Sequence, residues 1–233
     1  MIYAVEQIES EFEKVMDGYT GLLTVRLQNL CVKSHPMAMI PVIVEVAGQE
    51  NVLEDVAECA IPDDDHIEVY PKNEDYFLAV VKGVMETHPE FQAEEKNTKV
   101  GDSYLHYLSF KIPPVNKDRR DVLLNGVDVF YQEAKAQYEA TKGKYTIKLT
   151  QKLTDVQASK EDVDEYKKRN EETYDNHKKL AEDTVNDKKK EIEDAYQRYL
   201  QNQDASEQAS KEQQAAEGKE VKSSIQMPTF EQS

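Results

Sequence analysis

The stretch KIPPVNKDRR at residues 111–120 separates two different sequence patterns in this chain of 233 residues. Pro113 and Pro114 each disfavour helix in the preceding residue, so we expect the alternating segment 104–112 to be a strand that ends there. Asn116 can then cap a long helix, which we expect over residues 117–153. The stretch therefore predicts the point at which a β-containing region stops and a helical region begins.

Two other segments carry apolar residues at helical spacing. Residues 4–30 form one such stripe, which is typical of a long amphipathic helix. Ser159, followed three residues later by Asp162, has the spacing of a weak capping box and would open a third helix. Because none of the three helices is apolar all round, they can bury their stripes only against one another. We therefore predict an elongated three-helix bundle.

The segment between the first and second helices has a different pattern. It is rich in β-branched residues and turn signals, with one amphipathic stretch that Asn73 is placed to cap. We expect strands at 42–46, 56–61, 66–70 and 104–112, a helix at 73–87, and a polar loop at 88–102. These elements predict a small α/β domain.

The order of these elements places the α/β domain inside the bundle. We predict an α+β protein in which residues 1–34 and 111–200 form the bundle and residues 35–110 form the inserted domain. Both connections contain prolines, and relative motion is the default for a small interface between domains. We therefore expect a hinge at Pro36, Pro41, Pro113 and Pro114. Residues 201–233 are rich in Gln, Ser, Glu and Ala, so we expect a disordered or frayed tail there.

Composition restricts the class of function. Charged residues make up 32% of the chain, the formal net charge is -17, and the mean hydropathy is -0.77. A net acidic chain is a poor generic binder of polyanions, although a local basic face can exist within it. The segment expected to form the inserted domain carries roughly four acids per lysine, which favours a basic protein partner for that arm.

The sequence contains little that indicates catalysis or a metal site. Cys31 and Cys59 lack ligand spacing, and no glycine-rich phosphate loop or nucleophile motif occurs. His177 is expected to pack within the bundle, and the turn 63–66 and the basic run 188–190 are expected to be solvated. No leader or apolar run of about 20 residues is present. We therefore expect a cytoplasmic, non-enzymatic, monomeric protein without metal or cofactor.

The same stretch, residues 111–120, is similar to the double-proline, capped, double-arginine entry into a helix that is found in the ribosome recycling factor family. Residues 33–36, KSHP, resemble that family's Arg-Ala-Ser-Pro, and Val44-Glu45 with Gly48 resembles its first strand. The similarity extends over roughly residues 5–200. It implies an L-shaped molecule that enters the intersubunit space of the ribosome after termination and helps to separate the subunits. The implied partners are the ribosome, through large-subunit rRNA, and the translocase elongation factor.

The resemblance also indicates where RNA contacts belong. Arginines of the family correspond to Lys33, Arg119, Arg120, Lys135 and Lys142, which are the candidate rRNA contacts of this chain. Other arginine positions of the family are occupied here by residues without a positive charge: Leu30, Asp128, Glu139 and Gly143. Lysine also lacks the bidentate fork that arginine presents to phosphate. Two readings follow: a ribosome recycling factor-like protein, or a diverged paralogue that keeps the fold and binds a protein without recycling activity.

Overall fold

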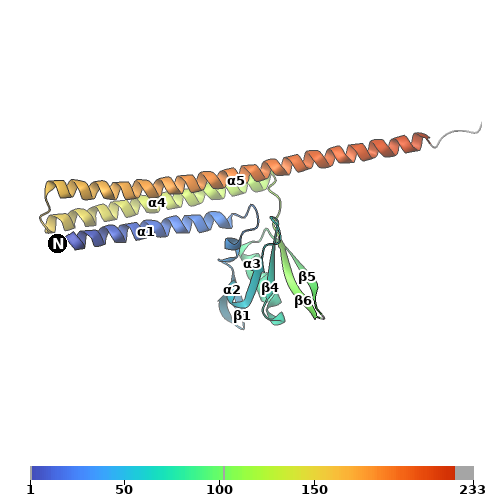
Figure 1. Ribbon diagram of the computed structural model, residues 1–233, viewed down its shortest axis with the longest axis horizontal. Helices are drawn as coiled ribbons and strands as arrows, with labels where there is room; N and C mark the ends of the chain where they lie inside the picture. The colour runs from blue at the N-terminus through green and yellow to red at the C-terminus, as the bar shows by residue number, and fades with distance from the viewer. Residues whose placement is uncertain (1, 102, 224–233) are drawn as a thin grey trace, which may run out of the picture.

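The long helices of the chain lie side by side, as their apolar stripes predicted. The computed structural model describes residues 2–101 and 103–223, and its three long helices are α1 (Ile2–Asn29), α4 (Lys117–Asp155) and α5 (Lys160–Ser223). α4 runs antiparallel to α1 and α5, and each helix contacts the other two (Figure 1). Their stripes form one apolar core, whose largest fully buried members include Phe12, Met16 and Tyr138. The prediction of a three-helix bundle is confirmed.

Local capping signals set the starts of α4 and α5. The side chain of Asn116 accepts a hydrogen bond from the N–H of Arg119 at 2.9 Å. Ser159 Oγ accepts one from the N–H of Asp162 at 3.1 Å. Each bond satisfies an N–H that has no partner within the helix. Both helices therefore begin where their cap residues predicted.

The α/β domain joins the bundle at the end remote from the N-terminus and projects sideways, so that the molecule is L-shaped (Figure 1). Its sheets are a β1–β2 hairpin and a four-stranded antiparallel sheet in the order β3-β4-β6-β5. The helix α3 packs beside them, and a second apolar core lies between these layers. The bounds of its elements are η1 (Pro36–Met39), β1 (Ile43–Val46), β2 (Gln49–Val52), α2 (Leu53–Val56), β3 (Ala57–Ala60), β4 (His66–Pro71), η2 (Glu74–Tyr76), α3 (Phe77–Thr87), β5 (Gln92–Val100) and β6 (Ser103–Lys111).

The structure explains why glycine occupies two positions in this domain. Ala47 and Gly48 form the two-residue turn between β1 and β2, and both have positive φ, 52° and 78°. Such a turn matches the twist of a hairpin, and glycine adopts it without strain. At Gly83, in α3, an added Cβ would lie 2.4 Å from the carbonyl oxygen of Ile43. The absence of a side chain at Gly83 therefore allows α3 to pack directly on the backbone of β1.

The structure corrects the predicted loop at residues 88–102. Residues 92–100 form β5, which pairs with β6 along its whole length, from Gln92↔Lys111 to Val100↔Ser103. This strand, QAEEKNTKV, is almost entirely polar because it is the edge of the sheet and is exposed. An edge strand with both faces wet has no apolar alternation to reveal it. The strand β2 was not predicted either, since QENV is polar for the same reason.

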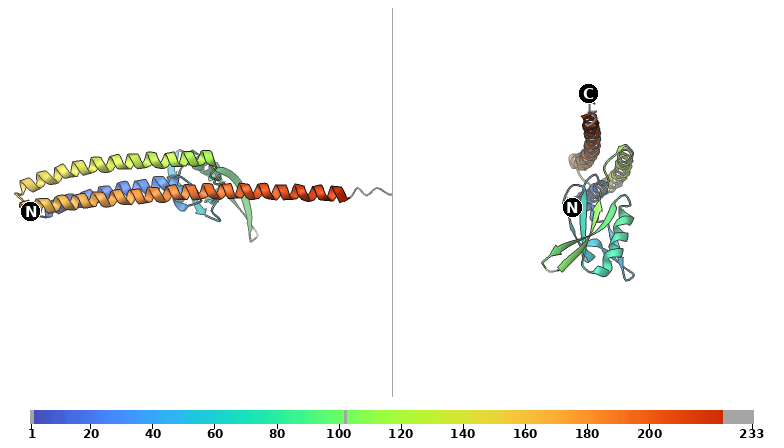
Figure 2. Two further views of the ribbon diagram at one scale, coloured as in Figure 1. Left: turned by 90° about the horizontal axis from the view of Figure 1, so that it is seen from above. Right: turned by 90° about the vertical axis from the view of Figure 1, so that its right-hand side faces the viewer.

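The predicted tail is also corrected. α5 does not end near residue 200 but continues to Ser223, and residues 201–211 are all exposed. Figure 2 shows this extension running beyond the end of the bundle. The segment is rich in Gln, Glu, Ala and Lys, which are strong helix formers, and it continues a helix that has already nucleated. Low hydrophobicity therefore prevented packing without preventing helix formation. The last ten residues of the predicted tail, 224–233, lie outside the described residues.

Candidate nucleic-acid interface

The five candidate RNA contacts do not form one cluster. Arg119 and Arg120 lie in the first turn of α4, Lys135 and Lys142 lie further along the same helix, and Lys33 follows α1. From Arg120 to Lys142 the helix rises about 33 Å, at 1.5 Å per residue. The candidates therefore mark the length of the bundle, and each has its own surroundings.

Arg119 joins the two arms of the molecule, the bundle and the α/β domain. One of its guanidinium nitrogens donates to the carbonyl oxygen of Pro113, and the other donates to that of Cys31 at 2.6 Å. Burial lowers the pKa of this guanidinium from its usual value, although Glu90 nearby opposes the shift. Both connections between the arms are therefore fastened by one side chain. Arg119 is occupied by carbonyl groups of the chain itself and is not presented to an outside phosphate.

Arg120 is neutralised by carboxylates. Its Nε donates to both oxygens of Glu193, at 2.9 and 2.8 Å, a second nitrogen also binds Glu193, and a third donates to Asp121 at 2.9 Å. Its guanidinium carbon lies 5.3 Å from the centre of the Tyr196 ring. A phosphate would have to displace these partners in order to bind.

Lys142 and Glu139 both contact Tyr174 of α5. Lys142 Nζ lies 2.5 Å from a carboxylate oxygen of Glu171 and 4.1 Å from the centre of the Tyr174 ring. The hydroxyl of Tyr174 donates to Glu139 at 2.5 Å. Burial and this carboxylate raise the pKa of Tyr174. Glu139, which the resemblance aligns with an arginine of the family, is therefore a carboxylate bound within the bundle.

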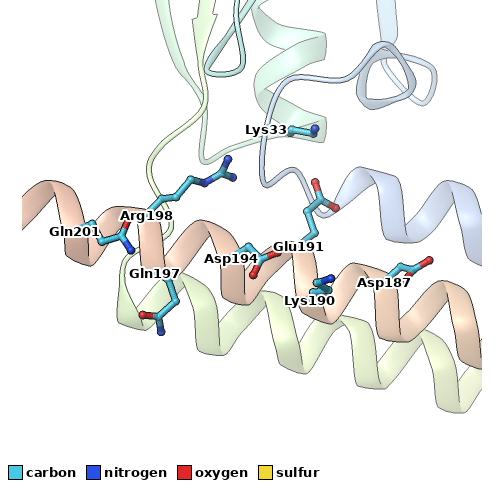
Figure 3. A pocket seen from close by; sticks show the side chains of 8 residues that line it. All are labelled: Lys33, Asp187, Lys190, Glu191, Asp194, Gln197, Arg198 and Gln201. Atoms are coloured by element: carbon cyan, nitrogen blue, oxygen red, sulfur yellow. The ribbon is translucent and has the colours of Figure 1, made fainter.

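Two candidate cations remain exposed. Lys33 and Lys135 are on the surface, and neither has an ion pair with any residue in the described part of the chain. Lys33 borders an open depression of about 540 Å³ against α5 (Figure 3). Its lining balances three cations with three carboxylates: Lys33, Lys190, Arg198, Asp187, Glu191 and Asp194. This depression has no excess positive charge with which to attract phosphate.

The other positions that the resemblance aligns with family arginines also have defined surroundings. Asp128 pairs with Lys189 at 2.6 Å, and Leu30 packs against the bundle core over Gly126, where an added Cβ would lie 3.1 Å from it. Gly143 is exposed in α4, with no atom within 4 Å of an added Cβ. Asp128 therefore has a partner on α5, Leu30 packs on the core, and Gly143 borders open space.

The basic run at residues 188–190 differs from the solvated face that was expected. Lys188 is 6% exposed and pairs with Glu191 at 3.0 Å, while Lys189 pairs with Asp128. The stem of a lysine can be buried while its ammonium finds a partner, as in Lys188, whereas Lys190 is exposed as expected. His177 packs within the bundle, as expected, with its Nδ1 3.0 Å from Thr20 Oγ1.

The junction between the bundle and the α/β domain contains functional candidates that the sequence did not reveal. We call it the elbow; it comprises the connections 31–41 and 111–116 and the turn 63–66. The N–H of Ser34 donates to the carbonyl oxygen of Asp64 at 2.7 Å, and the N–H of Ile112 donates to that of Asp65 at 2.8 Å. The turn that was expected to be solvated therefore holds both connections through its backbone. The prolines expected to form a hinge lie on these connections: Pro36 opens η1, Pro41 follows it, and Pro113 and Pro114 lie between β6 and α4.

A buried histidine completes the elbow. His88 Nε2 contacts the carbonyl oxygen of Ala38 at 2.7 Å, and His88 Nδ1 lies 4.0 Å from Cys31 Sγ and 3.7 Å from Glu90. Burial by itself would lower the pKa of His88, but the bonds to Cys31 and Glu90 raise it to about 10. Burial by itself would raise the pKa of Glu90, but its bond to His88, a backbone hydrogen bond and the nearby charges of His88 and Arg119 together lower it. No short sequence motif marks this cluster, because its members come from segments that are far apart in the chain.

Two further features, a metal site and a membrane-spanning helix, were looked for in the described part of the chain. Among residues 2–101 and 103–223, no group of three or more His, Cys, Asp and Glu side chains is placed to hold a metal ion. The search of the described helices for a segment long and apolar enough to cross a membrane also found none.

Comparisons with known proteins agree with the two-armed fold. A solution structure of a ribosome recycling factor superposes with a TM-score of 0.62 at 17% identity, covering 83% of this chain and 100% of that one. The T. thermophilus ribosome recycling factor, placed with the E. coli elongation factor G on the E. coli post-termination complex, gives 0.52 at 18% identity, covering 81% and 98%. A search of curated sequences gave no significant match. The sequence profile of ribosome recycling factor matches residues 26–192, so the chain belongs to the ribosome recycling factor family.

Proposed function

We propose that this protein binds ribosomes and acts in the separation of their subunits after termination, as a binding protein and not as an enzyme. The observation that carries the proposal is the family match over residues 26–192 in a chain with the family's two-armed fold. The related structure that includes elongation factor G on a post-termination complex supports the same partners for this chain. In this proposal the bundle faces rRNA and the α/β domain moves against it about the elbow.

A second candidate function is favoured by a specific observation. Of the five candidate cations, Arg120 and Lys142 are paired with carboxylates and Arg119 is bound to backbone carbonyls. A diverged paralogue that keeps the fold and binds a protein partner would show this pattern. The two functions differ in how binding to ribosomes depends on salt.

Co-sedimentation with ribosomes across a salt series separates the two functions. Each phosphate contact contributes about 0.9 to the slope of log K against log salt on duplex DNA, and we take a similar value for duplex rRNA. With Lys33 and Lys135 as the exposed cations, we expect weak binding and a slope of only about 2. Tight binding with a steep slope would show that the paralogue reading is wrong.

A rescue variant sharpens this test. The triple change Glu139→Arg, Lys142→Arg and Gly143→Arg restores arginine on one side of α4, and Gly143 has room for the new side chain. We expect tighter binding and a steeper slope. The matched control, Asn202→Arg with Glu207→Arg, adds the same three positive charges to the exposed extension of α5. If the triple variant binds no better than this control, the missing arginines do not limit binding, and a protein partner becomes the better proposal.

A further inference from the structure

One face of the four-stranded sheet is only half covered. Four strands spaced about 4.8 Å apart span about 19 Å, whereas a helix with its side chains is about 10 Å across. α3 supplies one helix, whose Val80 and Val84 are buried in the same core as Ile67 and Val69 of β4. The strands β6 and β5, at one side of the sheet, extend beyond α3 (Figure 2). The sheet therefore offers a place for a second helix beside α3.

An apolar groove occupies that place. It has a volume of about 510 Å³, and its apolar lining comes from α3, β5 and β6: Phe77, Leu78, Val81, Ala93 and Leu108. Leu108 is buried and forms the floor, whereas Leu78 is 84% exposed. Leu78 is the most exposed of the large hydrophobic side chains in the described part of the chain. An exposed leucine beside a partly open apolar face indicates a contact surface.

The rim of the groove is acidic. Glu74 lines it from the α3 side and Glu95 from β5, with His106 on β6. Neither carboxylate has an ion pair with a residue in the described ranges, although the neighbouring Glu94 pairs with Lys96 at 3.3 Å. The domain formed by residues 35–110 carries 16 acidic and 4 basic side chains. Charge complementarity therefore selects a basic occupant.

We propose that this groove binds a basic amphipathic helix of another protein, with an apolar face on Leu78 and Leu108 and lysines or arginines at Glu74 and Glu95. This is the helix-in-groove mode of recognition. A second copy of this chain is a poor occupant, because a symmetric contact would bring the carboxylates of the two rims together. The proposal does not depend on ribosome binding, and either one can fail while the other stands.

A fluorescein-labelled 18-residue peptide of leucine and lysine, with one apolar and one basic face, is a suitable probe for the full chain. Fluorescence anisotropy would measure its affinity beside that of a scrambled peptide of the same composition. We expect the amphipathic order to bind at least about tenfold more tightly. Equal binding of the two peptides would overturn the proposal, because it would show attraction by charge alone.

Variants then locate the site. Leu78→Ser should weaken binding by about tenfold or more, since it removes most of the gain from burying one leucine. Its matched control, Val122→Ser, alters another side chain that is largely exposed, at 70%, on the bundle. Glu74→Gln with Glu95→Gln should weaken binding severalfold and flatten its salt dependence. Glu50→Gln with Glu58→Gln makes the same charge change elsewhere in the domain and should have little effect.

Besides equal binding of the two peptides, three results would overturn the proposal. One is an equal loss in Leu78→Ser and Val122→Ser, and another is an equal loss in the two pairs of glutamate variants. The third is a dimer in analytical ultracentrifugation that Leu78→Ser abolishes, because it would identify a second copy as the occupant. All six substituted side chains are exposed, so none of these results can be attributed to unfolding of a variant.

Discussion

The two arms of this molecule handle charge in opposite ways. The bundle segments, residues 1–34 and 111–200, carry 24 acidic and 22 basic side chains, whereas the α/β domain carries 16 and 4. In the bundle, cations on one helix meet carboxylates on another, as in Arg26–Glu133, Lys148–Glu11 and Arg169–Glu9. In the described residues of the α/β domain, most carboxylates have no ion pair.

This difference changes the meaning of the overall net charge of -17. The excess of acid is concentrated in the α/β domain, so it says little about whether the bundle can bind RNA. Three of the five candidate RNA contacts, Arg119, Arg120 and Lys142, are instead already bound within the molecule. Ion pairing within the bundle and net negative charge would each oppose RNA binding. Single substitutions can remove the ion pairs.

The largest effect we predict comes from separating the arms. Replacing residues 42–108 with a short Gly/Ser linker should leave a bundle that melts cooperatively, because the two apolar cores are distinct clusters. Far-ultraviolet circular dichroism and thermal melting would measure this. Loss of the helical signal would contradict it and would show that the bundle depends on the acidic arm.

Two glycine substitutions compare packing in the arms. Gly83→Ala should destabilise the protein by about 1–3 kcal/mol, because the new methyl group meets the backbone of Ile43. Gly143→Ala should instead stabilise it by up to about 1 kcal/mol, since the site is open and alanine favours helix. Urea denaturation would measure both changes. A similar effect of the two substitutions would mean that the close approach of α3 to β1 is not maintained in solution.

The elbow should make stability depend on pH. His88 has a pKa raised to about 10 in the folded protein, against 6.5 when unfolded. Its stabilisation is therefore complete below pH 6.5 and is lost as the pH rises toward 10. The melting temperature should fall between pH 6.5 and 8.5, a range below the usual pKa of 9.0 for cysteine.

His88→Gln is the control for this pH dependence. Glutamine retains an N–H that can donate to the carbonyl group of Ala38, and it does not titrate. The melting temperature of this variant should be flatter over the same range. An unchanged slope in the variant would assign the effect to other groups.

The smallest effect is expected from truncation. Ending the chain after residue 200 should change the free energy of unfolding by less than about 0.5 kcal/mol, because residues 201–211 are all exposed. Differential scanning calorimetry would detect a larger change. Limited proteolysis should also cut this extension before the bundle. Equal resistance along the chain would contradict the picture of a helix without tertiary contacts.

The sequence by itself determined the elements that rest on local physical chemistry. The apolar stripes predicted three helices that pack together, and Asn116 and Ser159 predicted where α4 and α5 begin. Prolines and β-branched runs predicted where the α/β domain interrupts the bundle. These signals can be read from the sequence because a cap acts within one turn and a stripe repeats along one helix.

Only the tertiary structure decided the elements and roles that depend on a distant partner. β5 is a strand because β6 lies beside it, although its own residues are polar. Arg119 looked like a phosphate contact but fastens the elbow, and Arg120 is neutralised by Glu193, which lies 73 positions away. Whether a cation is free or paired depends on how helices register against one another. That register arises from packing of the whole core, and it has no local signature in the chain.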